Sequence, residues 1–577
     1  MKAVAVIAGL MMMIFAAESA EAAKPIIDSE CVSQILSNLY VSKRDVSLYK
    51  KIFRALAAND IKEADQLAKD VNNQILMGHV KAEKYLSRGY KASYDELKRW
   101  LEVYYDHPQA PRIYKLAASR GGKKGLVDPD ENKPAPKRSP YSWYNNDYEN
   151  LTPANRGLVR KKVTEFRRYI NKGKTKAARN ILENHTFRMA IPNREYDAMS
   201  ATLATVYLLD NQDKLALQWV KKASRRSNDA TAQWIGGLAA WRLGDYKTSA
   251  AYFANLGSQS DNDEWLVAAG AYWAHRAYHK LNKPKEAGKW LKIASKYKRT
   301  FYGMLANYQL GQPWDFNWDG VSYLNDFNNY DYLNEMMASA SIQRAIILIW
   351  AKNKNLAEKE LRRSYAGMTV KQKETVLYLA KQYNMHSLAI RISNDIKDNE
   401  QCRFYDDIAY PVPDWRPKSG WKVNRALVLA LVRQESAFTP TARSASGARG
   451  LMQLMPNTAV HVTKDRSLKR DSSPLYDTEY NMEVGQQYVN YLLQKPFVNG
   501  NLFFLAAAYN AGPGNLYKWQ KSARYKDDPL LFIEVIPARE TRIYIERVMA
   551  NFWAYNARFN ETHKSMDELV SGRWPTL

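Results

Sequence analysis

The chain has 577 residues, of which 46% are hydrophobic and 25% are charged, and it carries a net charge of +26. Its length exceeds what one hydrophobic core serves, so two to four domains are expected, and its composition excludes a largely disordered protein. Residues 406–577 hold 22 Lys and Arg against 17 Asp and Glu, so +21 of the net charge falls on the preceding residues. A basic surface favours a polyanion such as nucleic acid, anionic lipid or an acidic wall polymer.

The first 23 residues have the pattern of a secretory signal peptide. Lys2 precedes an apolar run, and Ala20-Glu21-Ala22 fits the small-residue cleavage pattern near residues 20–23. An uncleaved membrane anchor is the alternative, but the run of about 15 residues is short for a bilayer span. We therefore expect an exported protein without stable membrane insertion, and export argues against nucleic acid as the partner.

The chain contains two cysteines, Cys31 and Cys402. Export permits a disulfide between them, but two unpaired thiols are the alternative, and the sequence leaves both open. Two Cys and eight scattered His form no metal-ligand spacing, so we expect neither a metal site nor a cofactor.

Helical periodicity dominates the chain from about residue 24 to residue 118. The stretches "DIKEADQLAKDV" and "DELKRWLEVYY" place apolar residues three and four apart. Gly, Pro and Lys dominate the stretch that follows, without an apolar period. This stretch, at about 119–140, is therefore predicted to be a flexible loop.

Repeated helical hairpins are predicted from about residue 148 to residue 400. Short polar turns followed by new helices begin at Leu208 ("LLDNQDKLALQW"), Arg242 ("RLGDYKTSAAYF") and Lys280 ("KLNKPKEAGKWL"). Units of about 34–38 residues are typical of stacked helical pairs, so we expect a curved solenoid. Such a solenoid could hold a long polymer, or it could serve as a protein-docking scaffold.

The helical pattern breaks at residues 405–425, which contain three prolines. We therefore place a domain boundary here. The predicted fold class is all-α, with a solenoid over 24–400 and a separate domain over 406–577.

Glu435 is the one acid in the stretch "RQESAFTPTARSASGARGLMQLMPNTA", and it is expected at the end of a buried helix that Pro440 prevents from continuing. Met452 and Met455, at the start of another predicted apolar helix, could form a flexible wall near this acid. Apolar surroundings raise the pKa of a carboxyl group, as a general acid at neutral pH requires. A lone Glu at a helix end is otherwise a surface residue.

Four motifs follow one another in the final segment: the ES pair at Glu435, "GARGLMQLMP", "AAYNAGPGN" and "IPARETRIYIERV". Together and in this order they resemble the motifs of one family, the soluble lytic transglycosylases of the bacterial cell wall. Upstream, "AYWAHRAY" (271–278) and "TFYGMLA" (300–306) resemble stretches of the helical domain of the same enzymes. The resemblance implies a ring-like α-superhelix followed by a lysozyme-like catalytic domain, in the periplasm.

The resemblance also implies roles for individual residues. Glu435 corresponds to the catalytic acid and base, and the hydroxyl and amide of the AYN pair are expected to approach it and the sugar. Core packing of Met455, a turn at Asn510 and pairing of Glu540 with a neighbouring Arg are the alternatives. The residues expected to line the sugar site are Ser444, Gln453, Met455, Tyr509, Asn510, Glu540 and Tyr544.

The implied substrate is the peptidoglycan glycan strand, and the implied reaction needs only one carboxyl group. Glycosidases ordinarily use two carboxylates, whereas here the substrate's own C6 hydroxyl would attack and form a 1,6-anhydro ring. Two alternatives stay open, a lysozyme-type hydrolase and a non-catalytic peptidoglycan-binding scaffold. Protein partners in cell-wall synthesis or secretion are compatible with export but are not identified by the sequence.

Overall fold

The structure, a computed structural model, describes residues 39–129, 151–223, 229–318, 335–397 and 404–577. Within these ranges every regular element is a helix, and β pairing is confined to isolated bridges such as Arg443–Arg449. The all-α prediction is therefore confirmed. The predicted signal peptide and both cysteines lie outside the described residues.

The described chain forms two compact units, and neither is continuous in sequence. The first unit consists of residues 39–129, 317–318, 335–397 and 404–411. The second unit consists of residues 151–223, 229–316 and 412–577. The domain boundary at residues 405–425 stays a prediction. The helices of the stretch 24–400 are divided between the two units, because those before and after residue 317 fold into different units.

Short amphipathic helices build the first unit around two apolar cores. The larger core joins its earliest helices to those after residue 340 and includes Tyr49, Ile52 and Ile346. A smaller core surrounds Trp100. The helices are α3 (Lys43–Ala57), α4 (Ile61–Lys69), α5 (Met77–Leu86), α6 (Tyr94–Tyr104), α7 (Ala110–Gly121), α21 (Ala340–Trp350), α22 (Lys354–Ser364), η2 (Tyr365–Gly367), α23 (Val370–Gln382), α24 (His386–Ile396) and α25 (Asp406–Ala409).

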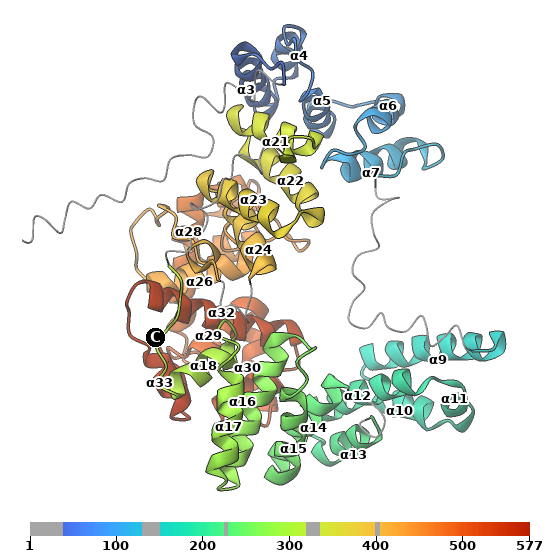
Figure 1. The fold of residues 1–577 in the computed structure, drawn as a ribbon, viewed down its shortest axis with the longest axis vertical. Coiled ribbons are helices and arrows are strands. Elements are labelled where there is room, and N and C mark those ends of the chain that lie inside the picture. The colour runs from blue at the N-terminus through green and yellow to red at the C-terminus, as the bar shows by residue number, and fades with distance from the viewer. Residues whose placement is uncertain (1–38, 130–150, 224–228, 319–334, 398–403) are drawn as a thin grey trace, which may run out of the picture. The chain divides into compact units, whose positions relative to one another are not determined.

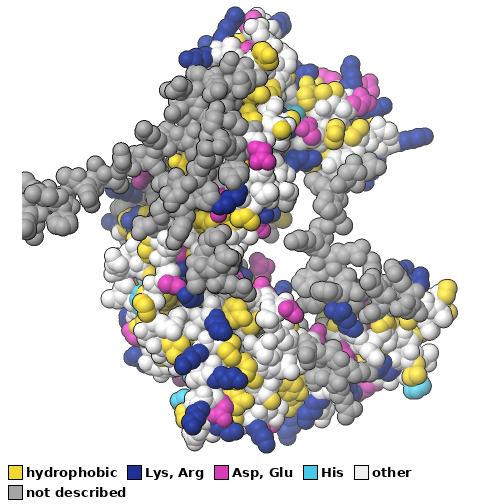
Figure 2. Space-filling view, viewed as in Figure 1, with side chains coloured by type: hydrophobic (Ala, Val, Ile, Leu, Met, Phe, Trp, Pro, Cys, Tyr) yellow, Lys and Arg dark blue, Asp and Glu magenta, His cyan; other side chains and the backbone are white. Residues whose placement is uncertain are grey.

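The second unit begins with a run of helices, coloured teal to green in Figure 1. These helices are α9 (Pro153–Asn171), α10 (Thr175–Glu183), α11 (His185–Ala190), α12 (Asn193–Leu209), α13 (Asp213–Ala223), α14 (Ala230–Leu243), α15 (Tyr246–Gly257), α16 (Glu264–Lys280), α17 (Pro284–Ala294) and α18 (Phe301–Gln309). Many Lys and Arg side chains are visible on the face of the molecule drawn in Figure 2.

The three predicted hairpins are confirmed as the pairs α12–α13, α14–α15 and α16–α17, whose helices pack against each other. Each turn contains one residue in the left-handed backbone region: Asn211 (φ 60°), Gly244 (φ 80°) and Asn282 (φ 55°). Asn and Gly adopt this region at the lowest cost, so they end one helix and reverse the chain into the next.

Small residues let adjacent hairpins approach closely. Gly257 at the end of α15 faces Gly270 in α16, and a Cβ atom added to Gly257 would lie 2.8 Å from the Ala271 nitrogen. Backbone atoms cannot move aside as a flexible side chain does. A larger residue at this crossing would therefore push the two helices apart.

The second unit ends with the segment that carries Glu435, coloured orange to red in Figure 1. The motif "TFYGMLA" packs into this segment, because α18 lies against its helices α32 and α33 and the Tyr302 hydroxyl donates to Glu534 at 2.5 Å. The segment comprises α26 (Arg425–Ser436), α27 (Pro456–Thr463), η3 (Arg466–Lys469), η4 (Ser473–Tyr476), α28 (Thr478–Leu493), α29 (Leu502–Ala511), α30 (Pro513–Ser522), α31 (Pro529–Val535), α32 (Arg539–Arg558) and α33 (Lys564–Val570).

Candidate active site

Glu435 lies in the last turn of α26, as the sequence predicts. The preceding residues 426–432 are all buried, so the helix is fixed in the core, while its last turn is partly exposed. The helix ends because Ala437 and Phe438 both adopt left-handed backbone conformations, with φ of 45° and 60°. Pro440, the predicted terminator, lies beyond this turn.

Tyr544 contacts the carboxyl group of Glu435 directly. Helix α32 packs along α26, and the Tyr544 hydroxyl donates a hydrogen bond to Glu435 Oε1 at 2.6 Å. Burial and the negative charge of Glu435 raise the pKa of Tyr544 well above its ordinary value. The phenol therefore stays protonated and acts as a donor to the carboxylate.

The pKa of Glu435 is raised to about 7. Burial is the largest cause, and the negative charge of Glu540 raises the pKa further, while the hydrogen bond from Tyr544 lowers it. Among the described residues no Lys, Arg or His forms an ion pair with Glu435. This carboxyl group is therefore divided between its protonated and ionised forms near neutral pH, as a group that donates and then accepts a proton requires.

Tyr509 lies near Glu435 but bonds to the backbone of a neighbouring loop. Its hydroxyl donates to the Met452 carbonyl oxygen at 2.8 Å, and its ring centroid lies 5.4 Å from that of Tyr488. Burial raises the pKa of Tyr509 well above its ordinary value, and the negative charge of Glu435 contributes. Tyr509 therefore links the "GLMQ" loop to the surroundings of the acid.

The "GLMQ" residues form a loop, and helix α27 begins only at Pro456, later than the sequence predicts. Gln453 has a left-handed backbone with φ 47°. Its amide donates to the carbonyl oxygens of Gly450 at 2.8 Å and Ala442 at 3.2 Å. Met452 is fully buried, so it belongs to the packing beneath the loop.

Ser444 and Met455 lie at the two ends of the same loop region. The Ser444 hydroxyl accepts a hydrogen bond from the Ala448 nitrogen at 3.0 Å, which closes the "SASGA" turn. The Met455 side chain is 39% exposed, just before α27. Because Met455 is not part of the core, its exposed side chain is free to contact a ligand.

Asn510 and Glu540 come from the two helices that pack around Tyr509 and Tyr544. Asn510 Oδ1 accepts a hydrogen bond from the Thr541 hydroxyl at 2.7 Å, which joins α29 to α32. Glu540 is exposed in the first turn of α32. It influences Glu435 through its charge, and no hydrogen bond joins the two carboxylates among the described residues.

Two contributors to the site were not predicted. Tyr488 packs on Tyr509, and Asn551 Oδ1 accepts a hydrogen bond from Arg433 Nη1 at 2.6 Å, which joins α32 to the final turns of α26. The sequence points to Asn551 only because this residue is polar and lies within the apolar stretch "VMANFWAYN". Tyr488 has no comparable signal, because aromatic residues are frequent throughout the chain.

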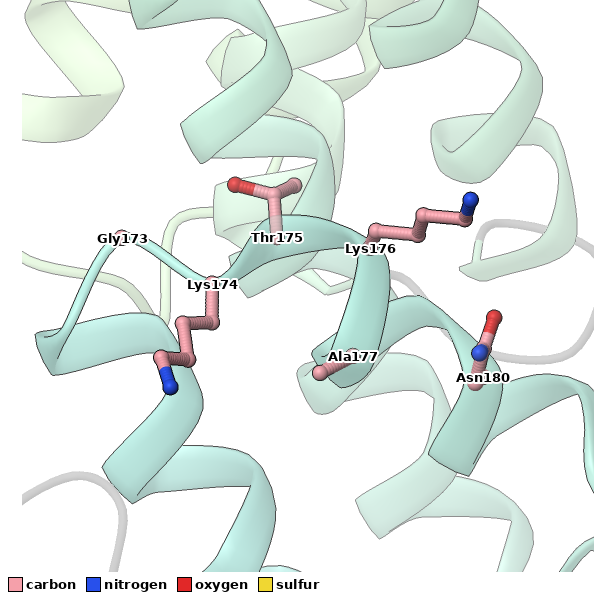
Figure 3. A pocket seen from close by; sticks show the side chains of 6 residues that line it. All are labelled: Gly173, Lys174, Thr175, Lys176, Ala177 and Asn180. Atoms are coloured by element: carbon pink, nitrogen blue, oxygen red, sulfur yellow. The ribbon is translucent and has the colours of Figure 1, made fainter.

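A surface pocket elsewhere in the second unit is shown in Figure 3. It is lined by the residues at the start of α10, among them Lys174, Thr175 and Lys176. The pocket contains no carboxylate, and its side chains point in different directions. It is therefore no candidate for acid–base chemistry, and the site around Glu435 is the stronger one.

Comparison with known proteins agrees with the motifs. Residues 416–532 match the family model described as "Transglycosylase SLT domain". The chain is 29% identical over 342 residues to the soluble lytic murein transglycosylase of Escherichia coli K12, an alignment that covers 58% of this chain and 50% of that protein. The chain thus spans about half the length of this curated relative.

Two solved structures resemble the chain over most of its length. The 70 kDa soluble lytic transglycosylase SLT70 of Escherichia coli superposes with a TM-score of 0.61 and 18% identity, covering 90% of this chain and 97% of that one. An inactive glutamate-to-glutamine mutant of lytic transglycosylase Slt from Pseudomonas aeruginosa has a TM-score of 0.59 and 20% identity, with 89% and 97% covered. The predicted fold class and the resemblance to soluble lytic transglycosylases are confirmed.

Within the described part of the chain, no helix combines the length and the apolar character needed to cross a membrane.

Proposed function

We propose that this chain, which resembles the soluble lytic transglycosylases, is a lytic transglycosylase that cleaves the MurNAc-β-1,4-GlcNAc bond of peptidoglycan. The observation that carries the proposal is the Glu435 carboxyl group, whose pKa is about 7 and which accepts a hydrogen bond from Tyr544. This acid lies within the segment that matches the transglycosylase domain.

In the first half of the reaction, protonated Glu435 donates its proton to the glycosidic oxygen. The bond between this oxygen and the anomeric carbon of MurNAc breaks, and the GlcNAc hydroxyl leaves. Positive charge develops at the anomeric carbon, where the 2-acetamido oxygen of the same sugar can stabilise it. Glu435 is now a carboxylate, and the Tyr544 hydroxyl stabilises its charge through the 2.6 Å hydrogen bond.

In the second half, the Glu435 carboxylate removes the proton of the MurNAc C6 hydroxyl. The C6 oxygen attacks the anomeric carbon, which closes the 1,6-anhydro ring and returns Glu435 to its protonated form. The nucleophile belongs to the substrate, so no second carboxylate is required. Its reaction is favoured when the sugar is held in position and water is excluded.

The other predicted residues are proposed to bind the sugar around Glu435. The "GLMQ" loop, held by Tyr509 and by the amide of Gln453, would form one wall of the site. Met455 is exposed beside this loop. Ser444, Asn510 and Glu540 are proposed to complete the sugar site from the neighbouring turn and helices.

A second candidate function is hydrolysis of the same bond. The observation that favours it is the charge of Glu540, which raises the pKa of Glu435. Paired carboxylates of this kind serve as acid and base in inverting glycosidases, where the second one activates water. No hydrogen bond joins Glu540 to Glu435 among the described residues, so the products of the reaction decide between the two functions.

Mass spectrometry of fragments released from purified peptidoglycan distinguishes these functions. The proposal predicts fragments one water lighter than hydrolysed ones, which carry an anhydro-muramic acid end. Hydrated fragments would instead establish the hydrolase. A folded protein that released no fragments would leave the scaffold function, in which the basic helices bind the polymer without cutting it.

The proposed place of action is the periplasm, where peptidoglycan is accessible. Peptidoglycan carries lactyl and peptide carboxylates, so its charge complements the +21 carried by residues 1–405. Partners in cell-wall synthesis or secretion are compatible with this location.

A further inference from the structure

Three potential metal ligands meet in the interior of the first unit, although the sequence indicates no such cluster. They are His79 in α5, His107 after α6 and Glu360 in α22, and their ligand atoms all lie within 4.8 Å of one another. His79 Nε2 is 2.7 Å from Glu360 Oε1. The exposed fractions are 0% for His79, 3% for His107 and 0% for Glu360.

Both imidazole rings are oriented by a second side chain. His107 Nδ1 is 3.0 Å from Asp106 Oδ1, and His79 Nδ1 lies between the two amide atoms of Gln109, 3.1 Å from Oε1 and 2.9 Å from Nε2. When both Nδ1 atoms carry the hydrogen, Asp106 Oδ1 and Gln109 Oε1 accept it, which leaves the Nε2 lone pair of each ring for a ligand. Metal-binding histidines are commonly held in this way, by a carboxylate or carbonyl on the other ring nitrogen.

The Nε2 atom of His107 lacks a hydrogen-bond partner among the described residues. This nitrogen is buried, and its ring lies close to that of His79, with centroids 4.7 Å apart. A buried nitrogen without a partner is rare and calls for an explanation. Gly78 borders the same nitrogen, since a Cβ atom added there would lie 2.3 Å from His107 Nε2.

The charges around the cluster favour a cation. Arg344 contacts both carboxylates, with Nε 2.7 Å from Glu360 Oε1 and Nη2 2.8 Å from Asp106 Oδ2. The side chains of Arg344 and Glu360 are buried, whereas the Asp106 side chain is 42% exposed, so the negative charge of Asp106 lies at the edge of the cluster. A metal cation bound here would add positive charge beside both carboxylates and would also satisfy His107 Nε2.

We propose that His79, His107 and Glu360 bind one divalent transition-metal ion, with zinc as the best match. Two imidazoles and one carboxylate form a donor set suited to zinc, whereas calcium and magnesium prefer oxygen ligands. Binding replaces the hydrogen bond between His79 Nε2 and Glu360 Oε1 and releases any proton on Nε2 to solvent. Arg344 keeps its contacts with Asp106 and Glu360 Oε2.

The ion would connect two segments that are far apart in sequence. His79 and Glu360 are separated by 281 positions, and the ligands come from α5, from the turn before α7, and from α22. The site is enclosed and lies in a unit that does not contain Glu435. The ion is therefore assigned a structural role.

Titration of the chelator-treated full chain with Co²⁺ tests the site, because cobalt replaces zinc and has visible d–d absorption. We expect one tightly bound equivalent per chain, displaced by Zn²⁺, with the band intensity of a four- or five-coordinate site. Zn²⁺ should also raise the midpoint of thermal unfolding. Absence of both the band and the thermal shift in the folded wild-type chain would overturn the proposal.

Two substitutions locate the ion. His107→Gln should remove the cobalt band, whereas the matched control His185→Gln, at an exposed histidine in the second unit, should keep it. Gly78→Ala provides a second test, because it places a methyl group against His107 Nε2 without removing a ligand, and it should weaken cobalt binding. Unchanged binding by both His107→Gln and Gly78→Ala would place the metal elsewhere and overturn the assignment.

Discussion

Glu435 and Glu360 are both largely enclosed by protein, yet their surroundings have opposite effects. Burial raises the pKa of Glu435 to about 7, with a tyrosine as its hydrogen-bond partner and no cation of the described ranges paired to it. Burial also acts to raise the pKa of Glu360, but the hydrogen bonds and charges of His79 and Arg344 hold it below its ordinary value. The partner, rather than the depth of burial, decides whether such a glutamate exchanges protons near neutral pH.

The opposite pKa shifts suit Glu435 to acid–base chemistry and Glu360 to a structural role. A carboxyl group divided between two protonation states can donate and accept a proton in one cycle. A carboxylate fixed in its ionised form by Arg344 can bind a cation or join helices, but it is a poor general acid. The following four substitutions test this contrast, from the largest expected effect to the smallest.

Glu435→Gln should reduce the rate of fragment release by about 1000-fold or more, since general acid–base catalysis alone contributes about 10²–10⁴-fold. Gln cannot transfer the proton, although it occupies nearly the same volume. The rate is measured on purified peptidoglycan, with circular dichroism to confirm the fold. The control Glu479→Gln changes an exposed acid in α28 and should keep full activity. Full activity in Glu435→Gln would remove the proposed catalytic role.

Arg344→Met should destabilise the protein by about 3–5 kcal/mol, because removing one partner of a buried ion pair leaves uncompensated charge. Here the charges left behind are the carboxylates of Glu360 and Asp106. Urea unfolding in chelator-containing buffer measures the loss without a contribution from bound metal. The control Arg362→Met breaks the partly exposed pair with Glu358 and should cost about 1 kcal/mol or less. Equal losses in the two variants would contradict the structural role of Glu360.

Tyr544→Phe should reduce kcat by about 10-fold to 100-fold, because a hydrogen bond to a charged group contributes about 1.5–3 kcal/mol. The hydrogen bond from Tyr544 lowers the pKa of Glu435, so its removal raises that pKa further. Activity that needs protonated Glu435 is lost as the pH rises through this pKa. The alkaline limb of the pH–rate profile should therefore move to higher pH. An unmoved limb would show that the group titrating there is not Glu435.

Much of the fold could be predicted because its signals are local. The turns at Asn211, Gly244 and Asn282 each place a residue that tolerates the left-handed conformation between two stretches of helical periodicity. The position of Glu435 at a helix end was also predictable, since glycines and Pro440 follow it closely. The end itself is set by Ala437 and Phe438, whose left-handed conformations no propensity would suggest.

The partners of the two glutamates could not be predicted with the same certainty, because they depend on tertiary packing. Tyr544 was one of several motif residues, and only the packing of α32 on α26 identifies it as the contact of Glu435. His79 and Glu360 are 281 positions apart, so no spacing rule connects them. The grouping of residues 335–397 with the N-terminal helices is equally non-local.

Glu540→Gln is expected to give the smallest of the four effects and the opposite pH shift. The negative charge of Glu540 raises the pKa of Glu435, so its removal lowers that pKa. The alkaline limb should then move to lower pH, opposite to the shift in Tyr544→Phe. Because Glu540 is exposed and solvent screens its charge, kcat at acidic pH should change little. A loss of activity as large as that of Glu435→Gln would instead identify Glu540 as a second catalytic carboxylate, and the one-carboxylate mechanism would be wrong.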